Sequence, residues 1–309
     1  MKFNLEHVRS QSGRIAIVTG ANTGIGYETA LGLAQTDMTV ILACRSLDRA
    51  TAAKAKILQQ VPKADVGVMA LDLSQLASVN AFVDEYCRQY SRLDLLINNA
   101  GIMAPPFSET EDGFERQLAV NHLGHFLLTS RLLDLMPDMP QSRVVSLSSN
   151  AHKMGRINFE DLQSTNKYSS MAAYAQSKLA CLMFADELQC RLEDQGKHIL
   201  SVCAHPGGSA TELARHFSKT AILVMRILLV PLMTHPPREA ALPTLYAALG
   251  DDVKGGEYFG PQGFLEMSGQ PGRATRSPGS KNRDVAEQLW IVSEQLTGTT
   301  YFSCQKTSS

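Results

Sequence analysis

Short apolar segments alternate with segments of helical periodicity along most of this chain. The apolar segments are RIAIVT at 14–19, TVILAC at 39–44, VGVMAL at 66–71, LDLLIN at 93–98, RVVSLS at 143–148 and HILSVCA at 198–204. Strands that are regularly separated by helices are typical of a parallel sheet covered on both faces. The sequence therefore predicts an α/β, Rossmann-like fold, with a doubly wound parallel β-sheet and helices on both faces.

We expect a single domain over residues 14–299, preceded by an N-terminal extension at 1–13 and followed by a flexible tail at 300–309. No linker rich in proline, glycine or serine divides the chain, and its 44% hydrophobic content is ample for one core. A long helix is expected over 114–135. The glycines and prolines of 269–280 predict a surface loop without regular structure.

The overall charge and the cysteines exclude several classes of function. The net charge of −1 gives no electrostatic footprint for nucleic acid, so a small uncharged partner is expected. The six cysteines show no CxxC or metal-ligand spacing, and neither disulfides nor a metal site are predicted. The first residues lack the apolar core of a secretory signal, so we expect a cytoplasmic protein.

One apolar segment, AILVMRILLVPLM at 221–233, is too short to span a bilayer and is interrupted by Arg226 and Pro231. Its simplest interpretation is a buried helix or a lid over a site. The alternative is a flap that also touches a membrane or a hydrophobic substrate. Membrane contact is therefore possible but not expected.

The glycine-rich stretch TGANTGIG, at 19–26, lies between the first strand and the first helix. There the pyrophosphate of a dinucleotide would meet backbone N–H groups and the positive end of a helix. Gly20 permits a tight turn, Gly24 permits close approach of a phosphate, and Gly26 permits the helix to pack near the strand. The spacing is TGxxxGxG rather than GxGxxG, and a purely structural turn is the alternative.

The end of the second strand reads LACRSLDR and indicates which dinucleotide would bind. An NAD site would present an acidic residue at this point, whereas here Arg45 could pair with a 2′-phosphate. This favours NADP, with NADPH preferred over NADH, although Arg45 could also be a solvated loop residue. Asp72, followed by Leu73 after the third strand, could reach the adenine edge or cap the next helix.

The stretch AYAQSKLA, at 173–180, places Tyr174 and Lys178 at positions i and i+4 of an expected helix, where their side chains share one face. The pair is common on its own and acquires meaning from its neighbours. The fourth strand ends in NNAG at 98–101 and the fifth ends in SLSS at 146–149. These groups converge on the carboxyl edge of the sheet, where ligands bind in open α/β folds.

Taken together and in this order, TGANTGIG, NNAG, a serine closing the fifth strand and YAQSK resemble the short-chain dehydrogenase/reductase family, over about residues 14–211. The resemblance implies that Asn121, Ser149, Tyr174 and Lys178 act together in catalysis, with Ser148 as the fallback for Ser149. It also implies which residues bind the cofactor: Gly20, Asn22, Thr23, Gly24, Ile25, Gly26, Arg45, Asp72, Leu73, Asn99, Ala100, Gly101, Tyr174, Lys178, Pro206, Gly207 and Thr211.

The chemistry of this family suits those residue types. When hydride reaches a carbonyl carbon, a proton has to reach the carbonyl oxygen, and Tyr174 can supply it. Lys178 favours the phenolate form of the tyrosine and is expected to bond the ribose hydroxyls. Ser149 stabilises the developing charge on the oxygen, and Asn121 would hold a water that links Lys178 to solvent.

Further features suggest a branch of the family. The two dozen residues between Ser149 and Tyr174, the NHLGHF motif at 121–126 and the C-terminal EQLWIVSEQLTG resemble retinol dehydrogenases and their bacterial relatives. This implies a hydrophobic aldehyde, ketone or alcohol as substrate, with lid or substrate regions at about 150–173 and 212–237. Histidines such as His122 and His125 are expected to bond neighbouring loops.

Three alternatives stay open from the sequence. The protein could reduce an activated carbon–carbon double bond instead of a carbonyl, because tyrosine can protonate carbon as well. It could also be a non-catalytic regulator that only binds the nucleotide. A homodimer through the helix that carries Tyr174 is possible, although the long insertion could interfere with that face.

Overall fold

The computed structural model describes residues 3–208 and 236–302 of the 309-residue chain. The described strands form one eight-stranded sheet in the order β3-β2-β1-β4-β5-β6-β7-β8. Their bounds are β1 Ile15–Thr19, β2 Thr39–Cys44, β3 Val66–Ala70, β4 Leu95–Asn98, β5 Arg143–Leu147, β6 Leu200–Ala204, β7 Tyr258–Pro261 and β8 Pro271–Arg273. All neighbouring strands are parallel except β7 and β8, so the predicted doubly wound α/β fold is confirmed.

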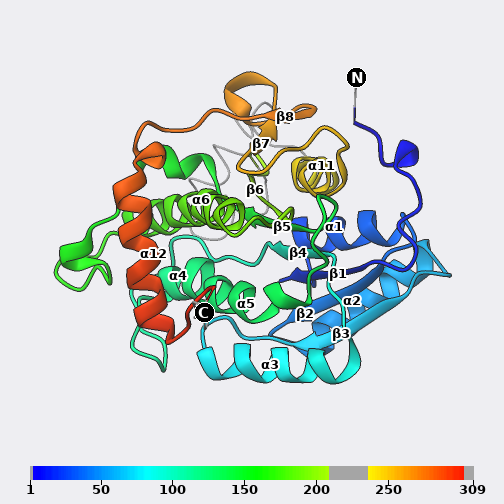
Figure 1. Ribbon diagram of the computed structural model, residues 1–309, viewed down its shortest axis with the longest axis horizontal. Coiled ribbons are helices and arrows are strands. Elements are labelled where there is room, and N and C mark those ends of the chain that lie inside the picture. The colour runs from blue at the N-terminus through cyan, green and yellow to red at the C-terminus, as the bar shows by residue number, and fades with distance from the viewer. Residues whose placement is uncertain (1–2, 209–235, 303–309) are drawn as a thin grey trace, which may run out of the picture.

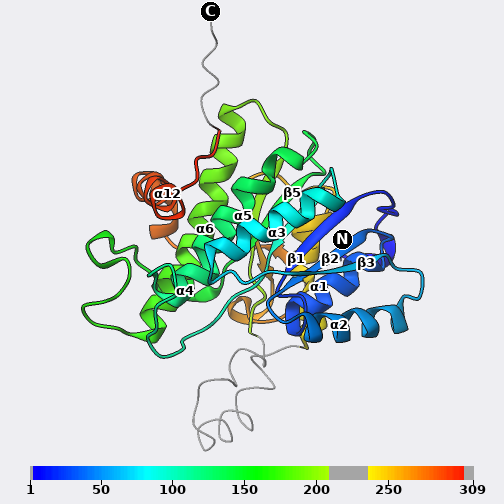
Figure 2. The same ribbon diagram turned by 90° about the horizontal axis from the view of Figure 1, so that it is seen from below.

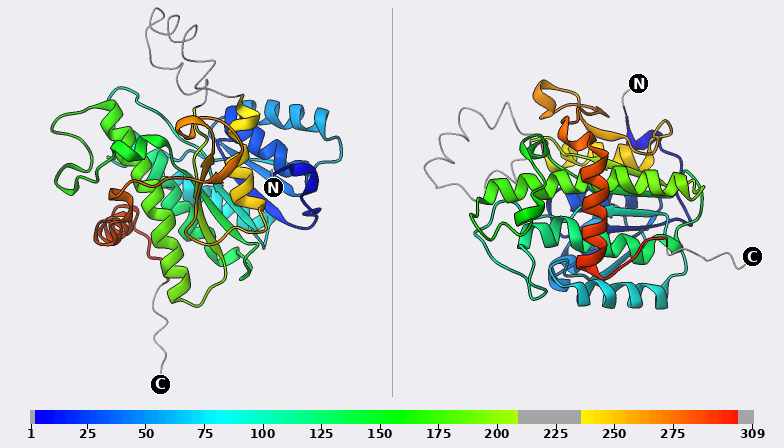
Figure 3. Two further views of the ribbon diagram at one scale, coloured as in Figure 1. Left: turned by 90° about the horizontal axis from the view of Figure 1, so that it is seen from above. Right: turned by 60° about the vertical axis from the view of Figure 1, so that its left-hand side comes forward.

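Helices cover both faces of this sheet (Figure 1). One face carries α1 (Gly24–Ala34), α2 (Leu47–Gln60) and α11 (Leu242–Leu249), which follows the short α10 (Pro237–Ala240). The other face carries α3 (Leu76–Gln89), α4 (Arg116–Leu118), α5 (Gly124–Leu132) and α6 (Ser170–Asp194). The last helix, α12 (Arg283–Thr297), crosses the outer side of α6 (Figure 3).

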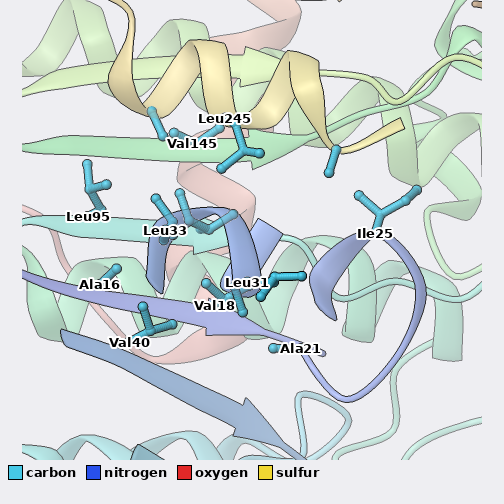
Figure 4. Packing of buried hydrophobic residues seen from close by; sticks show 14 of the residues in the cluster. Ala16, Val18, Ala21, Ile25, Leu31, Leu33, Val40, Leu95, Val145 and Leu245 are labelled. Atoms are coloured by element: carbon cyan, nitrogen blue, oxygen red, sulfur yellow. The ribbon is translucent and has the colours of Figure 1, made fainter. Parts of the chain in front are cut away.

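Alternation along the strands divides the core into two layers. Ala16 and Val18 of β1 face α1 and α11, where they pack with Leu245 (Figure 4). Ile17, between them in the chain, faces the opposite way and joins Phe126 of α5. Because successive side chains of a strand point to opposite faces, apolar residues at every position are what a sheet covered on both sides requires.

The helix expected over 114–135 is not continuous. It begins at Arg116, passes through a π-helical turn at Ala119–Leu123, continues as α5 and ends in a 3₁₀ turn at Leu133–Leu135. In the π turn the N–H of Gly124 bonds to the carbonyl of Ala119, five residues back. Such turns interrupt the regular ladder and are frequent at functional sites. The sequence shows only the helical periodicity and not this local change of spacing.

Two further expectations are wrong in part. The 269–280 segment is not wholly irregular, because β8 (Pro271–Arg273) pairs antiparallel with β7 and a 3₁₀ turn follows at Gly279–Lys281. The tail at 300–309 is not flexible from its start. Tyr301 is buried and its hydroxyl donates to the carbonyl of Phe126, since the aromatic cluster on α5 and α12 offers it an apolar site.

The chain starts in the middle of the sheet at β1, adds β2 and β3 on one side, and then adds β4 to β8 on the other side. The direction of strand addition therefore reverses between β1 and β4. The loops after these two strands diverge and leave a crevice at the carboxyl edge, which is where open α/β sheets bind ligands. The view in Figure 2 shows α1 and α2 on one side of this sheet and α3, α5 and α6 on the other. Across 3–208 and 236–302, no helix has the length and apolar character needed to cross a membrane.

Candidate active site

A cavity of about 580 Å³ occupies the carboxyl edge of the sheet. It is lined by the turn after β1, the loops after β2, β3 and β4, the end of β5 and the first turns of α6. The predicted residues that line it are Gly20, Asn22, Thr23, Gly24, Ile25, Gly26, Arg45, Asp72, Leu73, Asn99, Ala100, Gly101, Tyr174, Lys178 and Pro206. The fold thus brings motifs that are up to 186 residues apart (Gly20 to Pro206) to one site.

The glycine turn has the backbone that the sequence predicts. Gly20 and Gly24 have φ values of +66° and +60°, which lie in the left-handed region that only glycine adopts without strain. A Cβ on Gly26 would lie 2.6 Å from the carbonyl oxygen of Gly20 and would strike the side chain of Asn99. The turn therefore closes tightly at the start of α1 and forms a cradle of suitable shape for a pyrophosphate.

A second wall of the cavity follows β2. Arg45 and Arg49 are exposed and both line the cavity, with Ser46 between them. Ser46 is the N-cap of α2, since its hydroxyl accepts from the N–H of Arg49. Two cations and a helix N-terminus at one rim suit an anionic group. Sequence analysis missed Ser46 and Arg49, although the spacing RSLDR places both in the first turn of α2.

Of the two roles that the sequence left open for Asp72, capping of the next helix is wrong. Its carboxylate accepts from the N–H and the hydroxyl of Ser74, at 2.9 and 2.6 Å, and so shapes the turn that leads into α3. It does not cap that helix, because the N-cap residue is Gln75. Asp72 and Leu73 also line the cavity.

Tyr174 and Lys178 lie on the first half of α6 and are both nearly inaccessible to solvent, at 2% and 5% exposure. The ammonium of Lys178 lies 5.9 Å from the centroid of the Tyr174 ring and donates to the carbonyl of Leu147, at 3.0 Å. The bond to the last residue of β5 fixes the amine against the sheet. A cation held beside a phenol in a cavity favours ionisation of that phenol.

Asn121 lies in the π turn and its side-chain amide fastens two neighbouring segments. The Oδ1 atom accepts from the N–H of Ile102, at 2.8 Å, and Nδ2 donates to the carbonyl of Ile102 and to the hydroxyl of Ser177. A Cβ on Gly101 would lie 3.2 Å from both Asn121 Oδ1 and Lys178 Nζ. Asn121 therefore reaches the surroundings of the lysine through Gly101, and it links the NNAG loop to α6.

The two candidate serines differ in their contacts. Ser148 is buried, lines the cavity and donates its hydroxyl to the carbonyl of Lys178, at 2.7 Å. Ser149 is half-buried, caps the following 3₁₀ turn through Ala151, and is outside the set of cavity-lining residues. Ser148 therefore borders the cavity with its proton engaged by α6, and the role of Ser149 as donor to a substrate oxygen stays a prediction.

His152, in that 3₁₀ turn (Asn150–Met154), holds the backbone of Ser149. Its Nδ1 lies 2.7 Å from the carbonyl of Ser149, and its Nε2 accepts from the N–H of Ser277, at 3.2 Å. Burial lowers the pKa of His152 to about 4, so the ring is neutral at physiological pH. The expectation that histidines here bond neighbouring loops agrees with these contacts.

Other predicted residues lie farther away. Gly207 has a φ of +77° and sits against the carbonyl of Met267, outside the cavity lining. Thr211 and the segment 221–233 lie outside the described residues. Ser148, the fallback for Ser149, also lines the cavity. Cavity-lining residues that the sequence did not point to are Ala43, Cys44, Ser46, Arg49, Leu71, Ser74, Ile102, Met103, Pro105, Arg116, Val120 and Leu147. Most of these carry no motif of their own and are found only once the strands are placed.

The insertion before α6 is tied to the loop that follows β4. Gln117, buried at the start of the broken helix, accepts from the N–H of Ala104 and donates to Tyr168 and to the carbonyl of Ser170. The hydroxyl of Tyr168 donates to the carbonyl of Pro105, at 3.0 Å. These bonds tie the 150–173 insertion to the loop that carries the cavity residues Met103 and Pro105.

Comparison with known proteins agrees with this geometry. The family model described as short chain dehydrogenase matches residues 14–221. Human retinol dehydrogenase 13 is 42% identical over 296 residues, which span 93% of this chain and 85% of the relative. A crystal structure of an uncharacterized protein from Mycobacterium paratuberculosis is 39% identical, with a TM-score of 0.81, and covers 98% of this chain and 100% of its own. A short-chain dehydrogenase from Shigella flexneri, solved in complex with NADP, shares the fold at 24% identity, with a TM-score of 0.60 over 80% of this chain and 96% of its own.

Proposed function

This chain belongs to the short-chain dehydrogenase family and is thus an oxidoreductase, and from that premise we propose that it moves hydride between NADP(H) and a carbonyl or alcohol of a hydrophobic small molecule. One observation carries the proposal. Tyr174 and Lys178 line the same cavity as the glycine turn, with the lysine ammonium 5.9 Å from the tyrosine ring. A proton donor and a dinucleotide cradle therefore share one site.

The residues of the cavity fit a nicotinamide dinucleotide. The left-handed glycines Gly20 and Gly24 let the backbone approach a pyrophosphate at the N-terminus of α1. Asp72, Leu73 and the NNAG loop line the same cavity and would hold the adenine and ribose. When bound, the cofactor supplies or accepts the hydride.

The phosphate of NADP would be held at the rim formed by Arg45, Ser46 and Arg49. The guanidinium groups of Arg45 and Arg49, after the end of β2, attract a 2′-phosphate. An NAD site would have an acidic residue at the position of Arg45, where it would bond a ribose hydroxyl. This supports NADPH over NADH. Arg49, in the first turn of α2, adds a second cation at this rim, so the preference does not depend on Arg45 alone.

The chain's own residues supply the rest of the reaction. Tyr174 donates its phenolic proton to the substrate oxygen during reduction and takes it back during oxidation. Lys178 stabilises the phenolate and, from its place against Leu147, reaches the ribose. Ser149 donates a hydrogen bond to the oxygen as charge develops on it. Asn121 keeps the NNAG loop and α6 together through its bonds to Ile102 and Ser177, and a water held by Asn121 beside Lys178 stays a prediction.

The substrate side supports an apolar ligand. Met103 and Pro105 line the cavity beside the insertion. The human relative is named a retinol dehydrogenase, which agrees with a bulky hydrophobic alcohol or aldehyde. Pairing of two copies through α6 stays a prediction, and it would have to accommodate α12, which packs against that helix.

The test is oxidation of NADPH and NADH by purified protein against aliphatic, aromatic and isoprenoid aldehydes and ketones, with an enone panel and product analysis. Consumption of NADPH with an alcohol as product supports the proposal. If an enone instead yields the saturated ketone, the enzyme reduces carbon–carbon double bonds and the proposal is wrong. Arg45→Asp should lower the ratio of NADPH to NADH affinity by about tenfold, the worth of one charge-assisted bond. An unchanged ratio would remove Arg45 from the phosphate site.

A further inference from the structure

The buried imidazole of His125 lies between two segments of the candidate active site. His125 is the last residue of the NHLGH motif, one helical turn after Asn121, and it is 3% exposed. Its Nε2 lies 2.8 Å from the hydroxyl oxygen of Thr19, the last residue of β1. Its Nδ1 lies 3.2 Å from the carbonyl oxygen of Asn121.

The neighbouring bonds fix the direction of both contacts. The hydroxyl oxygen of Thr19 accepts from the N–H groups of Asn99 and Ala100, at 3.0 and 2.9 Å. Its one proton is then best donated to His125, because the alternative acceptor, the carbonyl of Ile97, is 3.3 Å away. With Nε2 accepting, Nδ1 carries the ring proton and donates to Asn121.

The ring is suited to this bridge because it stays neutral. Burial lowers the pKa of His125 to about 4, while the bond to the Asn121 carbonyl opposes the shift and the charge of Lys178 adds to it. Cys181 of α6 donates to the same carbonyl, at 3.1 Å. The Asn121 backbone is thus held from two sides, by the sheet edge through His125 and by α6 through Cys181.

His122 supplies a matched comparison on the same helical segment. It is 2% exposed, and burial lowers its pKa to about 3, so it is a neutral core histidine as well. Its Nε2, however, contacts the hydroxyl of Ser293 in α12, at 2.8 Å. One histidine therefore faces the cofactor loops and the other faces the C-terminal helix.

We propose that His125 is a positioning residue that fixes the carbonyl of Asn121 against Thr19. Through it, the glycine turn, the NNAG loop and the π turn keep one relative placement. The proposal rests on the proposed function, because it assigns His125 to the alignment of the nucleotide cradle with the residues around Lys178. His125 does not touch the reacting atoms in this arrangement.

The test compares His125→Phe with His122→Phe by fluorescence titration of NADPH, by kcat and KM on any carbonyl substrate that turns over, and by urea unfolding. Both variants lose one buried hydrogen-bonding imidazole, and we expect similar losses of stability. His125→Phe should also weaken NADPH binding by about tenfold and lower kcat, whereas His122→Phe should change neither.

Two conservative variants separate the contacts and serve if the phenylalanine variant does not fold. In His125→Asn the amide nitrogen can take the place of Nδ1 and keep the bond to Asn121, so kcat should be largely restored. In His125→Gln the amide can take the place of Nε2 and keep the bond to Thr19, so NADPH affinity should be largely restored. A role in core packing alone predicts no such division.

Equal effects of the His125 and His122 variants on NADPH affinity and kcat, in a protein that binds NADPH, would overturn this inference and leave the proposed function intact. The same holds if the asparagine and glutamine variants behave alike. Wild-type protein that binds neither NADPH nor NADH would overturn the proposed function, and this inference with it.

Discussion

The cofactor edge of the cavity and the loop between β7 and β8, at 262–270, are built in different ways. At the cofactor edge, Thr19, Asn121 and Lys178 are buried, and each makes hydrogen bonds to the backbone of a neighbouring element. In the loop between β7 and β8, which lies outside the cavity lining, Phe264 and Leu265 are 78% and 66% exposed. The edge is fixed by buried polar bonds, and the loop presents apolar side chains to solvent.

The loop between β7 and β8 is fastened mainly by one carboxylate. Glu266 accepts from the N–H of Thr275 and pairs with Lys153, at 3.0 Å, while His205 lies 3.6 Å away. Burial would raise the pKa of Glu266, but the bonds from His205, Thr275 and Lys153 outweigh it and hold the pKa well below its ordinary value. Leu265 and Glu266 have φ values of +52° and +56°, so this fastening holds a strained backbone.

This difference teaches how the two demands on the site are separated. The cofactor is the same in every turnover, so a rigid network of residues that lie close together in the sheet can bind it. Recognition of a particular hydrophobic substrate depends on loops that can vary without disturbing that network. We therefore expect changes at the cofactor edge to have larger and broader effects than changes in the loop between β7 and β8.

The largest effect should come from Lys178→Ala. Removal of the ammonium takes away the charge beside Tyr174 and a ribose contact, so kcat should fall by about 10²- to 10³-fold and NADPH affinity by about tenfold. Steady-state kinetics and nucleotide titration measure the two losses separately. Loss of turnover with unchanged NADPH affinity would contradict the ribose role of Lys178.

A smaller effect, on stability, is expected from Gly26→Ala. The new Cβ would lie 2.6 Å from the Gly20 carbonyl and against Asn99, so the unfolding free energy should fall by about 1–3 kcal/mol. Gly279→Ala is the matched control, because a Cβ there meets nothing within 4 Å, and it should change stability by less than about 0.5 kcal/mol. Urea midpoints measure both, and equal midpoints would show that the turn is not tightly packed.

The smallest effect should come from Lys153→Ala, which removes the partner of Glu266 in the loop between β7 and β8. The Lys153 side chain is 37% exposed, so its pair with Glu266 contributes less than about 1 kcal/mol to stability. We expect a change of KM for the carbonyl substrate of up to about threefold and no change in NADPH affinity. A loss of NADPH binding in this variant would show that this loop and the cofactor edge are not independent.

The fold could be predicted from the sequence because its signals are local. Apolar strands covered on both faces, and glycines with left-handed backbone at Gly20 and Gly24, leave little choice of architecture. The tyrosine and lysine of the site share one helix, so their i, i+4 spacing already places them together. For these features, the geometry of residues close in sequence is enough to predict the fold and the placement of the pair.

What could not be predicted depends on contacts between distant parts of the chain. The histidines were expected to bond neighbouring loops, but nothing in NHLGH shows that His125 meets Thr19, 106 residues earlier. The π turn around Asn121 and the burial of Tyr301 follow from packing against α6 and α12 rather than from propensity. Arg49 and Arg116 reach the cavity from helical turns that show no motif.

The most direct test of the account compares wild-type protein with Tyr174→Phe in two measurements on the same samples, NADPH affinity by titration and NADPH oxidation with the best carbonyl substrate. We propose Tyr174 as the proton donor, and phenylalanine keeps the ring but removes the acidic hydroxyl. We therefore expect the phenylalanine variant to bind NADPH as wild type does and to turn over at least about 10²-fold more slowly. Turnover at the wild-type rate in this variant would contradict the assignment of Tyr174 as the proton donor.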